Sequence, residues 1–214
     1  MNCTSAMRVN DMGGSVTGLA VKRWRHLETS RREVTQETAR LISEWLEPKT
    51  VHQWLDFGGG RQTYTPQGMH IASRSPANMI RVVTTEPDGR PIGVVALAHI
   101  NTVFGTAMIW GLRPRLRPPA RTNMAREMRA LMREAFETLD LRSVHAFVAD
   151  GNTISCAGML AAGFVDVGRQ RQCHVIDGEV YDRILFDITR EEFFDQEREL
   201  EAEQAEAMLQ EMAL

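Results

Sequence analysis

Apolar residues recur along this chain at two kinds of spacing, which predict strands and helices respectively. Runs rich in β-branched and aromatic residues are typical of strands, and they fall at 19–27, 78–85, 92–100, 102–112, 143–149, 165–176 and 179–188. Apolar residues three and four apart indicate amphipathic helices, at 35–46, 123–139 and 152–162, with one further helical turn at 51–57. Residues 1–16 are small and polar and predict a loose tail.

Two turn signals show how the predicted strands pair. Residues 86–90 read Glu-Pro-Asp-Gly-Arg and join the strands on either side of them as a hairpin. Because strand 102–112 follows almost at once, we expect three antiparallel strands before the next helix. Asp177-Gly178 suits a type I′ turn and joins the last two strands as a closing hairpin.

The stretch from Asn101 to Phe164 organises the rest of the chain. Strand 102–112 leads into an arginine-rich loop at 113–121, which is followed by a helix, a strand and a second, shorter helix. A strand–helix–strand crossover makes its two strands parallel, and the N-terminus of its helix can hold an anion. The sequence therefore predicts an anion site where the loop meets the helix.

Arginines are concentrated around this loop. Seven of them lie in a 21-residue window in which Glu127 is the only acid: Arg113, Arg115, Arg117, Arg121, Arg126, Arg129 and Arg133. Such local basicity favours a phosphate-bearing partner. The alternative interpretation is an ordinary solvated helix face.

Residues 190–214 carry the opposite charge. They hold nine acids and two arginines, a net charge of −7, so the rest of the chain carries about +4 against the total of −3. Their high helix propensity predicts a helix, but the apolar positions keep no clean heptad. Packing against its own domain, docking to a partner and formation of a homodimer all stay open for this segment.

Together these elements predict an α/β chain of the α+β kind, with a mixed, mainly antiparallel central sheet flanked by helices. We expect a flexible tail at 1–16, one domain at 17–189 and an acidic helical tail at 190–214. The hydrophobic fraction of 43% is enough for a substantial core.

Several broad classes of protein are disfavoured by the sequence. No apolar run approaches the roughly 20 residues of a membrane span, and the N-terminal residues lack the apolar core of a secretory signal. Cys3, Cys156 and Cys173 form an odd, scattered set without a CxxC pair, which indicates neither a disulfide framework nor a zinc site. We therefore expect a cytoplasmic protein.

Two local motifs and the order of elements resemble a known family. Asn152-x-x-Ser155 followed by Gly163-Phe164 is similar to the N-x-x-S … G-F signature of the GNAT N-acetyltransferases that act on ribosomal-protein alanines, spermidine and similar amines. Residues 131–139 resemble the LL-x-x-AFE-x-L helix of that branch. The resemblance covers roughly residues 19–188.

The resemblance implies transfer of an acetyl or other acyl group from acetyl-CoA, or another acyl-CoA, to a primary amine, without a metal. The acceptor would be a small-molecule amine or a protein N-terminus. A backbone N–H near Gly111 to Arg113 would polarise the thioester carbonyl. The cofactor-binding residues carried over from the family are Gly111, Leu112, Arg113, Arg117, Ala120, Arg121, Thr122, Asn123, Asn152 and Ser155.

The loop at 117–122 departs from the family pattern Q/R-x-x-G-x-G/A. Arg117 matches, but Ala120 and Thr122 replace both glycines, and the two residues after Arg117 are prolines without an N–H. Each charge-assisted hydrogen bond lost to a pyrophosphate costs about 1.5–3 kcal/mol. We expect the side chains of Arg113, Arg117 and Arg121 to compensate.

Proton transfer has few candidates in this sequence. His145 lies in the middle of a predicted strand and His99 near the end of another, and each is either catalytic or a structural histidine. Many relatives have a tyrosine acid where this chain has Met159, so no acid is assigned. His174 and Tyr181 are expected to face one another across the last hairpin.

Other functions fit the sequence less well. The arginine window lacks interleaved aromatics and any helix-turn-helix pattern, which disfavours nucleic-acid binding. Acids and histidines are not in metal-ligand spacing, and no G-x-S-x-G motif is present. Two hypotheses remain: an active acyl-CoA-dependent N-acyltransferase, or a catalytically inactive binding or scaffold protein of the same fold. The altered loop is the feature that separates them.

Overall fold

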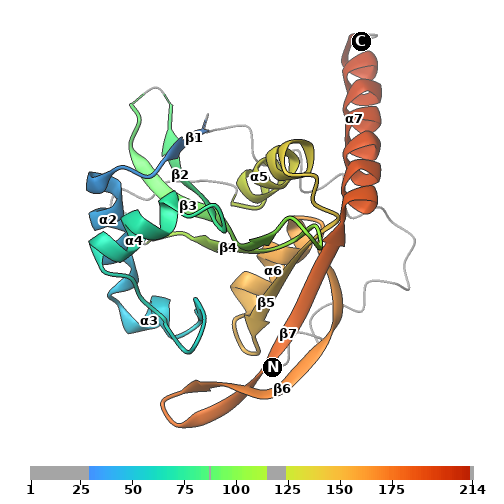
Figure 1. Ribbon diagram of the computed structural model, residues 1–214. Coiled ribbons are helices and arrows are strands. Elements are labelled where there is room, and N and C mark those ends of the chain that lie inside the picture. Colours follow the sequence, from blue (N-terminus) through green and yellow to red (C-terminus); the bar gives the residue numbers. More distant parts are fainter. Residues whose placement is uncertain (1–28, 87, 115–123, 213–214) are drawn as a thin grey trace.

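The computed structural model describes residues 29–86, 88–114 and 124–212. Seven strands form one sheet in the order β1-β2-β3-β4-β5-β7-β6, with helices on both faces (Figure 1). All neighbouring strands are antiparallel except β4 and β5. The expected mixed, mainly antiparallel sheet is confirmed. The strands are β1 (Thr29–Glu33), β2 (Met79–Thr85), β3 (Pro91–Asn101), β4 (Thr106–Leu112), β5 (Ser143–Ala149), β6 (Val165–Ile176) and β7 (Glu179–Thr189).

The helices begin where polar side chains satisfy their first backbone N–H groups. Thr35 caps α2 and exchanges hydrogen bonds with Thr38, while Asn152 caps α6. Thr65 followed by Pro66 starts α4, a helix that the sequence analysis missed. The helices are α2 (Gln36–Leu46), α3 (Lys49–His52), α4 (Pro66–Arg74), α5 (Met124–Thr138), α6 (Thr153–Ala161) and α7 (Arg190–Met212).

One of the expected strands lies outside the described residues, and another differs from the observed strand. The predicted strand at 19–27 lies outside the described residues, and the first described strand begins at Thr29. The prediction of a strand starting at residue 102 was wrong, because 102–105 form the turn between β3 and β4. Asn101 Oδ1 accepts hydrogen bonds from the backbone N–H groups of Val103 and Phe104, which holds this turn.

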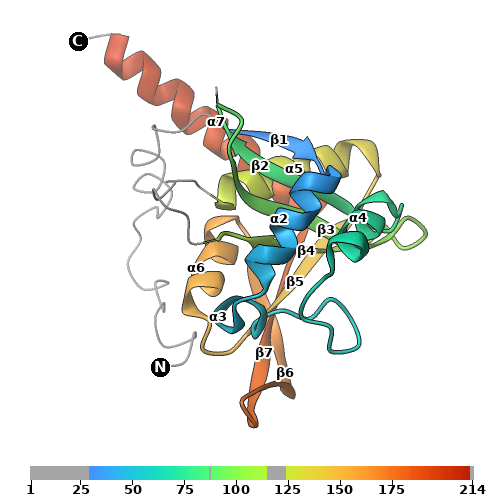
Figure 2. The same ribbon diagram turned by 90° about the vertical axis from the view of Figure 1, so that its left-hand side faces the viewer.

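The sheet separates two hydrophobic cores, and successive residues of its strands point into opposite ones. On β4, Ala107 and Ile109 pack in the core beneath α5, α6 and the first turn of α7. Trp110 and Leu112 pack in the core beneath α2 and α4. Figure 2 shows α2 in front of the sheet and α5 behind it.

The sheet opens between β4 and β5. Their parallel pairing runs from Thr106–Ser143 to Met108–His145 and ends there, although both strands continue. The other edge of β5 stays paired with β7 as far as Ala149. The facing edges of the last residues of β4 and β5 are therefore left without strand partners.

The last hairpin extends from the body of the molecule (Figure 1). Asp177 and Gly178 have φ angles of 54° and 83°, as the predicted type I′ turn requires, and His174 lies opposite Tyr181 as expected. His174 Nε2 lies 2.6 Å from the backbone oxygen of Gln53, so it donates to that oxygen. The hairpin is thus joined to the loop that follows α3.

The acidic C-terminal segment forms one helix, α7, whose two halves have different surroundings. Phe193 is fully buried against Phe136, with ring centroids 5.3 Å apart. From residue 201 to residue 210 the helix is exposed, and this half projects from the domain (Figures 1 and 2). Across the described part of the chain, no helix has both the length and the apolar character that a membrane span needs.

Candidate active site

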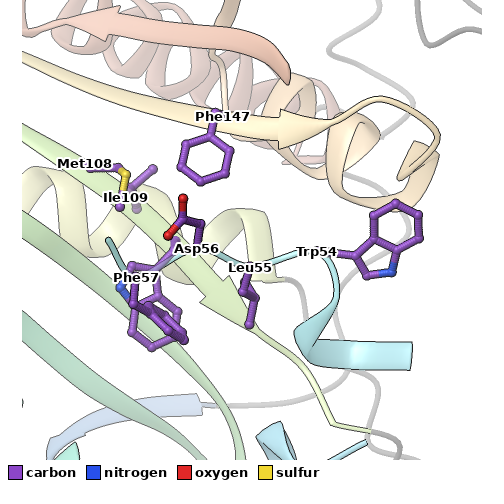
Figure 3. A pocket seen from close by; sticks show the side chains of 8 residues that line it. Trp54, Leu55, Asp56, Phe57, Met108, Ile109 and Phe147 are labelled. Atoms are coloured by element: carbon purple, nitrogen blue, oxygen red, sulfur yellow. The ribbon is translucent and has the colours of Figure 1, made fainter. Parts of the chain in front are cut away.

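A hollow lies where β4 and β5 separate. Its empty space, which includes space open to solvent, is about 320 Å³. Its walls come from β4, from β5 and from the loop after α3 (Figure 3). The lining residues are Trp54, Leu55, Asp56, Phe57, Met108, Ile109, Trp110 and Phe147.

Aromatic rings shape the hollow on the side of α2 and α4. The Phe57 ring meets Trp110 edge to face, with centroids 5.0 Å apart, and lies 4.8 Å from the Tyr64 ring. Local hydrogen bonds set the position of Phe57: Asp56 Oδ1 accepts from the backbone N–H of Gly58 at 2.9 Å and of Gly60 at 3.1 Å. Positive φ angles at these glycines let the chain turn sharply there.

The Asp56 carboxylate is held by an arginine from the far end of the sequence. Arg183 Nη2 donates to Asp56 Oδ2 at 2.8 Å, and both side chains are at least four-fifths buried. Burial alone would raise the pKa of Asp56, but the Arg183 guanidinium and the two glycine N–H groups outweigh it and lower that pKa below its ordinary value. The Arg183 guanidinium also lies 4.1 Å from the centre of the Phe147 ring. In Figure 3 the Asp56 carboxylate lies between Phe147 and Phe57.

The two histidines singled out in the sequence lie close to the split. His145 forms the last paired position between β5 and β4, opposite Met108. His99 occupies an irregularity of β3 with a φ of 52°, near the Gly58 turn. Desolvation of the imidazole, reinforced by the charge of His99, lowers the pKa of His145, while Asp187 acts in the opposite direction. His145 is nevertheless exposed enough to meet a substrate.

The expected cofactor residues on β4 have well-defined surroundings. A side chain at Gly111 would meet Met128 Cε at 2.5 Å, so glycine allows α5 to pack closely on this strand. Leu112 is buried, and Arg113 is exposed just after the strand. The other residues expected on the phosphate loop lie outside the described part of the chain: Arg117, Ala120, Arg121, Thr122 and Asn123.

Asn152 and Ser155 stand at the start of α6, directly after β5. Asn152 Oδ1 accepts from the backbone N–H of Ser155 at 3.2 Å, so the interpretation of Asn152 as a helix N-cap is confirmed. Both residues are partly exposed. The capping bond uses the amide oxygen of Asn152 and leaves its Nδ2 group to donate elsewhere.

Three arginines of the basic window bind acids of the chain itself. Arg126 contacts Glu127, and Arg129 and Arg133 both contact Glu197 of α7. Arg129 also donates to the backbone oxygen of Ala162 at 3.0 Å. Ion pairs within the protein therefore explain these three arginines without a bound phosphate. Among the described residues no group of acids, histidines or cysteines is arranged to hold a metal.

Two features of the site escaped the sequence analysis. The loop at 53–57 was read as a helical turn, and its aromatic residues were not linked to the strands. Arg183 was not singled out at all, because its partner Asp56 is 127 positions away. The one usable signal was the run Gly58-Gly59-Gly60, which marks a sharp turn directly after an aromatic segment.

Comparison with solved structures finds the same fold in acetyltransferases. Spermidine N-acetyltransferase from Vibrio cholerae, solved with CoA and spermine, is 16% identical, with a TM-score of 0.68 over 78% of this chain and 98% of that one. A probable acetyltransferase is 22% identical, with a TM-score of 0.63 over 77% of this chain and 94% of that one. No curated protein matches the sequence significantly.

A match to a family model shows which family the chain belongs to. The acetyltransferase (GNAT) domain model matches residues 25–165, about two thirds of the chain. That range includes β4, α5, β5 and α6, the elements around the split in the sheet. The chain belongs to the GNAT acetyltransferase family and is an N-acetyltransferase that transfers an acyl group from acyl-CoA to an amine.

Proposed function

We propose that amine and thioester meet in the hollow between β4 and β5. The observation that carries this proposal is the end of strand pairing at Met108 and His145, together with a hollow at that point. Acyl-CoA would lie along the open edges of the two strands, where backbone groups lack strand partners. The acceptor amine would enter from the side of Phe57 and Trp110.

The co-substrate fits the residues around the split. Backbone N–H groups of β4 near Gly111, Leu112 and Arg113 would polarise the thioester carbonyl. Asn152 and Ser155 would contact the pantetheine arm from the start of α6. The pyrophosphate would lie against the loop before α5 and the N-terminus of that helix, which favours negative charge. That loop supplies Arg117, Ala120, Arg121, Thr122 and Asn123.

His145 is our candidate for the base. Because its pKa is lowered, its imidazole is mainly neutral at pH 7 and can accept a proton from the amine, directly or through water. The amine nitrogen then forms a bond to the acyl carbon, and the bond from that carbon to sulfur breaks, leaving the electron pair on the thiolate. His99 is the second candidate. Met159 is buried and apolar and supplies no acid.

The acceptor is proposed to be a small-molecule amine. Spermidine N-acetyltransferase of Vibrio cholerae was solved with spermine, and its fold matches this chain over most of its length. Acylation of a protein N-terminus, a homodimer and a cytoplasmic location stay predictions of the sequence.

Binding and turnover test this proposal separately. Acetyl-CoA at about 100 times its Kd should add about 2.7 kcal/mol of stability, visible as a rise in Tm. Arg121→Glu should weaken that rise, whereas Arg198→Glu on the exposed face of α7 should leave it unchanged. Release of CoA thiol over a panel of primary amines measures turnover. No rise in Tm at millimolar acetyl-CoA and no thiol release would favour the inactive scaffold protein instead.

A further inference from the structure

We propose that the acceptor is an apolar monoamine with an aryl or alkyl body, and that Arg183 is the residue that discriminates against polyamines. This inference rests on the proposed function of the hollow as the acceptor site. It goes beyond that function because it names the class of amine and the residue that selects it.

The Asp56 carboxylate in the wall of the hollow already has hydrogen-bond partners within the protein. Of the described residues that line it, Asp56 alone is charged. Its Oδ2 accepts from Arg183 and its Oδ1 accepts from two backbone N–H groups. A substrate ammonium that approached Asp56 would meet the positive charge of the guanidinium, which already neutralises the carboxylate and is held at the same time by the Phe147 ring.

Two aromatic faces that could attract a cation are also occupied by arginines of the chain. Arg183 lies over Phe147, and Arg61 lies 5.6 Å from the centre of the Tyr64 ring. On the neighbouring hairpin, Arg169 pairs with both Asp150 and Asp182, at 2.6 and 3.6 Å. These carboxylates and these two aromatic rings are therefore satisfied within the protein.

The carboxylate of Asp187, near the proposed base His145, is not part of these ion pairs. Asp187 lies opposite His145 in the register of β5 and β7, and among the described residues no ion pair joins it to a cation. A single carboxylate beside the base can attract a single ammonium. A polyamine would bring further ammonium groups into an aromatic hollow without partners, and burial of an unpaired charge is costly.

The remaining surface favours an apolar body. Trp54, Leu55, Phe57, Met108 and Trp110 supply rings, a thioether and aliphatic carbon to the walls. Transfer of apolar substrate surface out of water to such walls is favourable. The reacting nitrogen of a bound arylalkyl amine would then lie toward His145, while its body would lie against Phe57 and Trp110.

A comparison of four amines as acceptors provides the first experiment. With saturating acetyl-CoA, thiol release gives kcat/KM for 2-phenylethylamine, hexylamine, putrescine and spermidine. We expect the two apolar monoamines to exceed the two polyamines by about tenfold or more, which corresponds to about 1.4 kcal/mol. Turnover in which spermidine equals or exceeds 2-phenylethylamine overturns this inference alone. Absence of turnover with every amine overturns the proposed function as well.

Charge variants provide the second experiment. Arg183→Met keeps an apolar stem against Phe147 and leaves Asp56 without its cation, so the ratio of kcat/KM for spermidine to that for 2-phenylethylamine should rise about tenfold. Adding Asp56→Asn to Arg183→Met should cancel that rise. Arg169→Met removes a comparable arginine whose carboxylate partners do not line the hollow, and should leave the ratio unchanged.

Circular dichroism and the acetyl-CoA shift in Tm show whether each variant is folded and binds its co-substrate. A folded Arg183→Met protein whose ratio stays at the wild-type value overturns the inference. The same holds if Arg169→Met raises the ratio as much as Arg183→Met does, because the effect would then be one of net charge rather than of this position.

Discussion

His145 illustrates how much of a residue's chemistry depends on its neighbours. The sequence placed it in the middle of a strand, where a structural histidine and a catalytic one look alike. In the fold it stands at the last paired position before β4 and β5 separate, with its pKa lowered by desolvation and by His99. A histidine that stays neutral at pH 7 in this position is suited to accept a proton.

Replacement of His145 should change the pH profile as well as the rate. The folded pKa lies below the ordinary value of 6.5, so the acid limb of kcat/KM should have its midpoint below pH 6.5. His145→Gln should lower kcat about 10²-fold or more and remove that limb. His99→Gln, measured in the same way, is the comparison. A His145→Gln enzyme with an unchanged profile and rate would exclude this residue as the base.

The lowered pKa of His145 also predicts that the stability of the protein depends on pH. Because the folded pKa of His145 is depressed, the unfolded chain binds more protons between that pKa and about pH 6.5. The contribution of His145 to the free energy of unfolding should therefore fall as the pH is lowered through this window. Urea unfolding of the wild type and of His145→Gln at several pH values measures the difference in their free energy of unfolding, which should be constant above about pH 7.5 and shift against the wild type as the pH falls through this window. A constant difference at all pH values would contradict the assignment.

The sequence marked Gly163 as part of a family motif but gave no reason why glycine stands there. The Gly163-Phe164 pair was recognised as part of a family signature, but the structure shows why glycine stands there. Its φ is 91°, and a Cβ would meet Gln196 and lie 2.5 Å from Arg129 Nη1. We expect Gly163→Ala to lower the free energy of unfolding by about 1–3 kcal/mol.

Gly158 is the matched control, because it lies in helix α6 with open space where a Cβ would be. Gly158→Ala should leave stability unchanged or raise it by up to about 1 kcal/mol. Thermal unfolding of the two variants side by side makes the comparison. Equal Tm values would contradict the steric explanation for Gly163.

At the scale of elements, the C-terminal helix is tied to the domain by its first turns. Arg129 of α5 donates to Gln196 Oε1 at 2.8 Å, to Glu197 Oε1 at 2.7 Å and to the backbone oxygen of Ala162. Phe193 completes this attachment in the core. The arginines that the sequence analysis assigned to phosphate thus hold α5, α7 and the turn after α6 together.

Loss of the Arg129 contacts to α7 should lower the free energy of unfolding more than deletion of the exposed end of the helix. Arg129→Met leaves the largely buried Glu197 without its main partner and should destabilise the protein by about 2–4 kcal/mol. Residues 205–210 are all exposed, so deletion of residues 205–214 should leave the free energy of unfolding unchanged within about 0.5 kcal/mol. Chemical denaturation of both proteins tests this contrast. A truncation as damaging as Arg129→Met would show that the tip is part of the fold.

Elements with strong periodicity were predicted well and weak ones were not. α2 and α5 carry apolar residues three and four apart and a continuous buried face, so both were found. α4 has a single buried residue, Met69, which is too faint a pattern to detect. Val103 and Phe104 look like strand residues but lie exposed in a turn, since Asn101 and Gly105 override their β propensity.

At the scale of the whole molecule, the opening of the sheet should govern binding of acyl-CoA. Strand edges without partners expose N–H groups that exchange with solvent, and a ligand along them should slow that exchange. We expect saturating acetyl-CoA to protect 109–112 of β4 and 146–149 of β5 in hydrogen–deuterium exchange. β2, which is paired on both sides, serves as the control and should not change. Protection confined to regions away from the split would contradict the proposed binding mode.

The sequence by itself determined most of the elements and the family, because turn chemistry, apolar spacing and short motifs such as Asn152-x-x-Ser155 act over a few neighbouring residues. Only the tertiary structure decided which side chains meet. Asp56 and Arg183 are 127 positions apart in the chain, and Asp56 lines the same hollow as Trp110 at the point where β4 and β5 part. Such contacts depend on how the whole sheet twists and opens, and no local pattern in the chain encodes them.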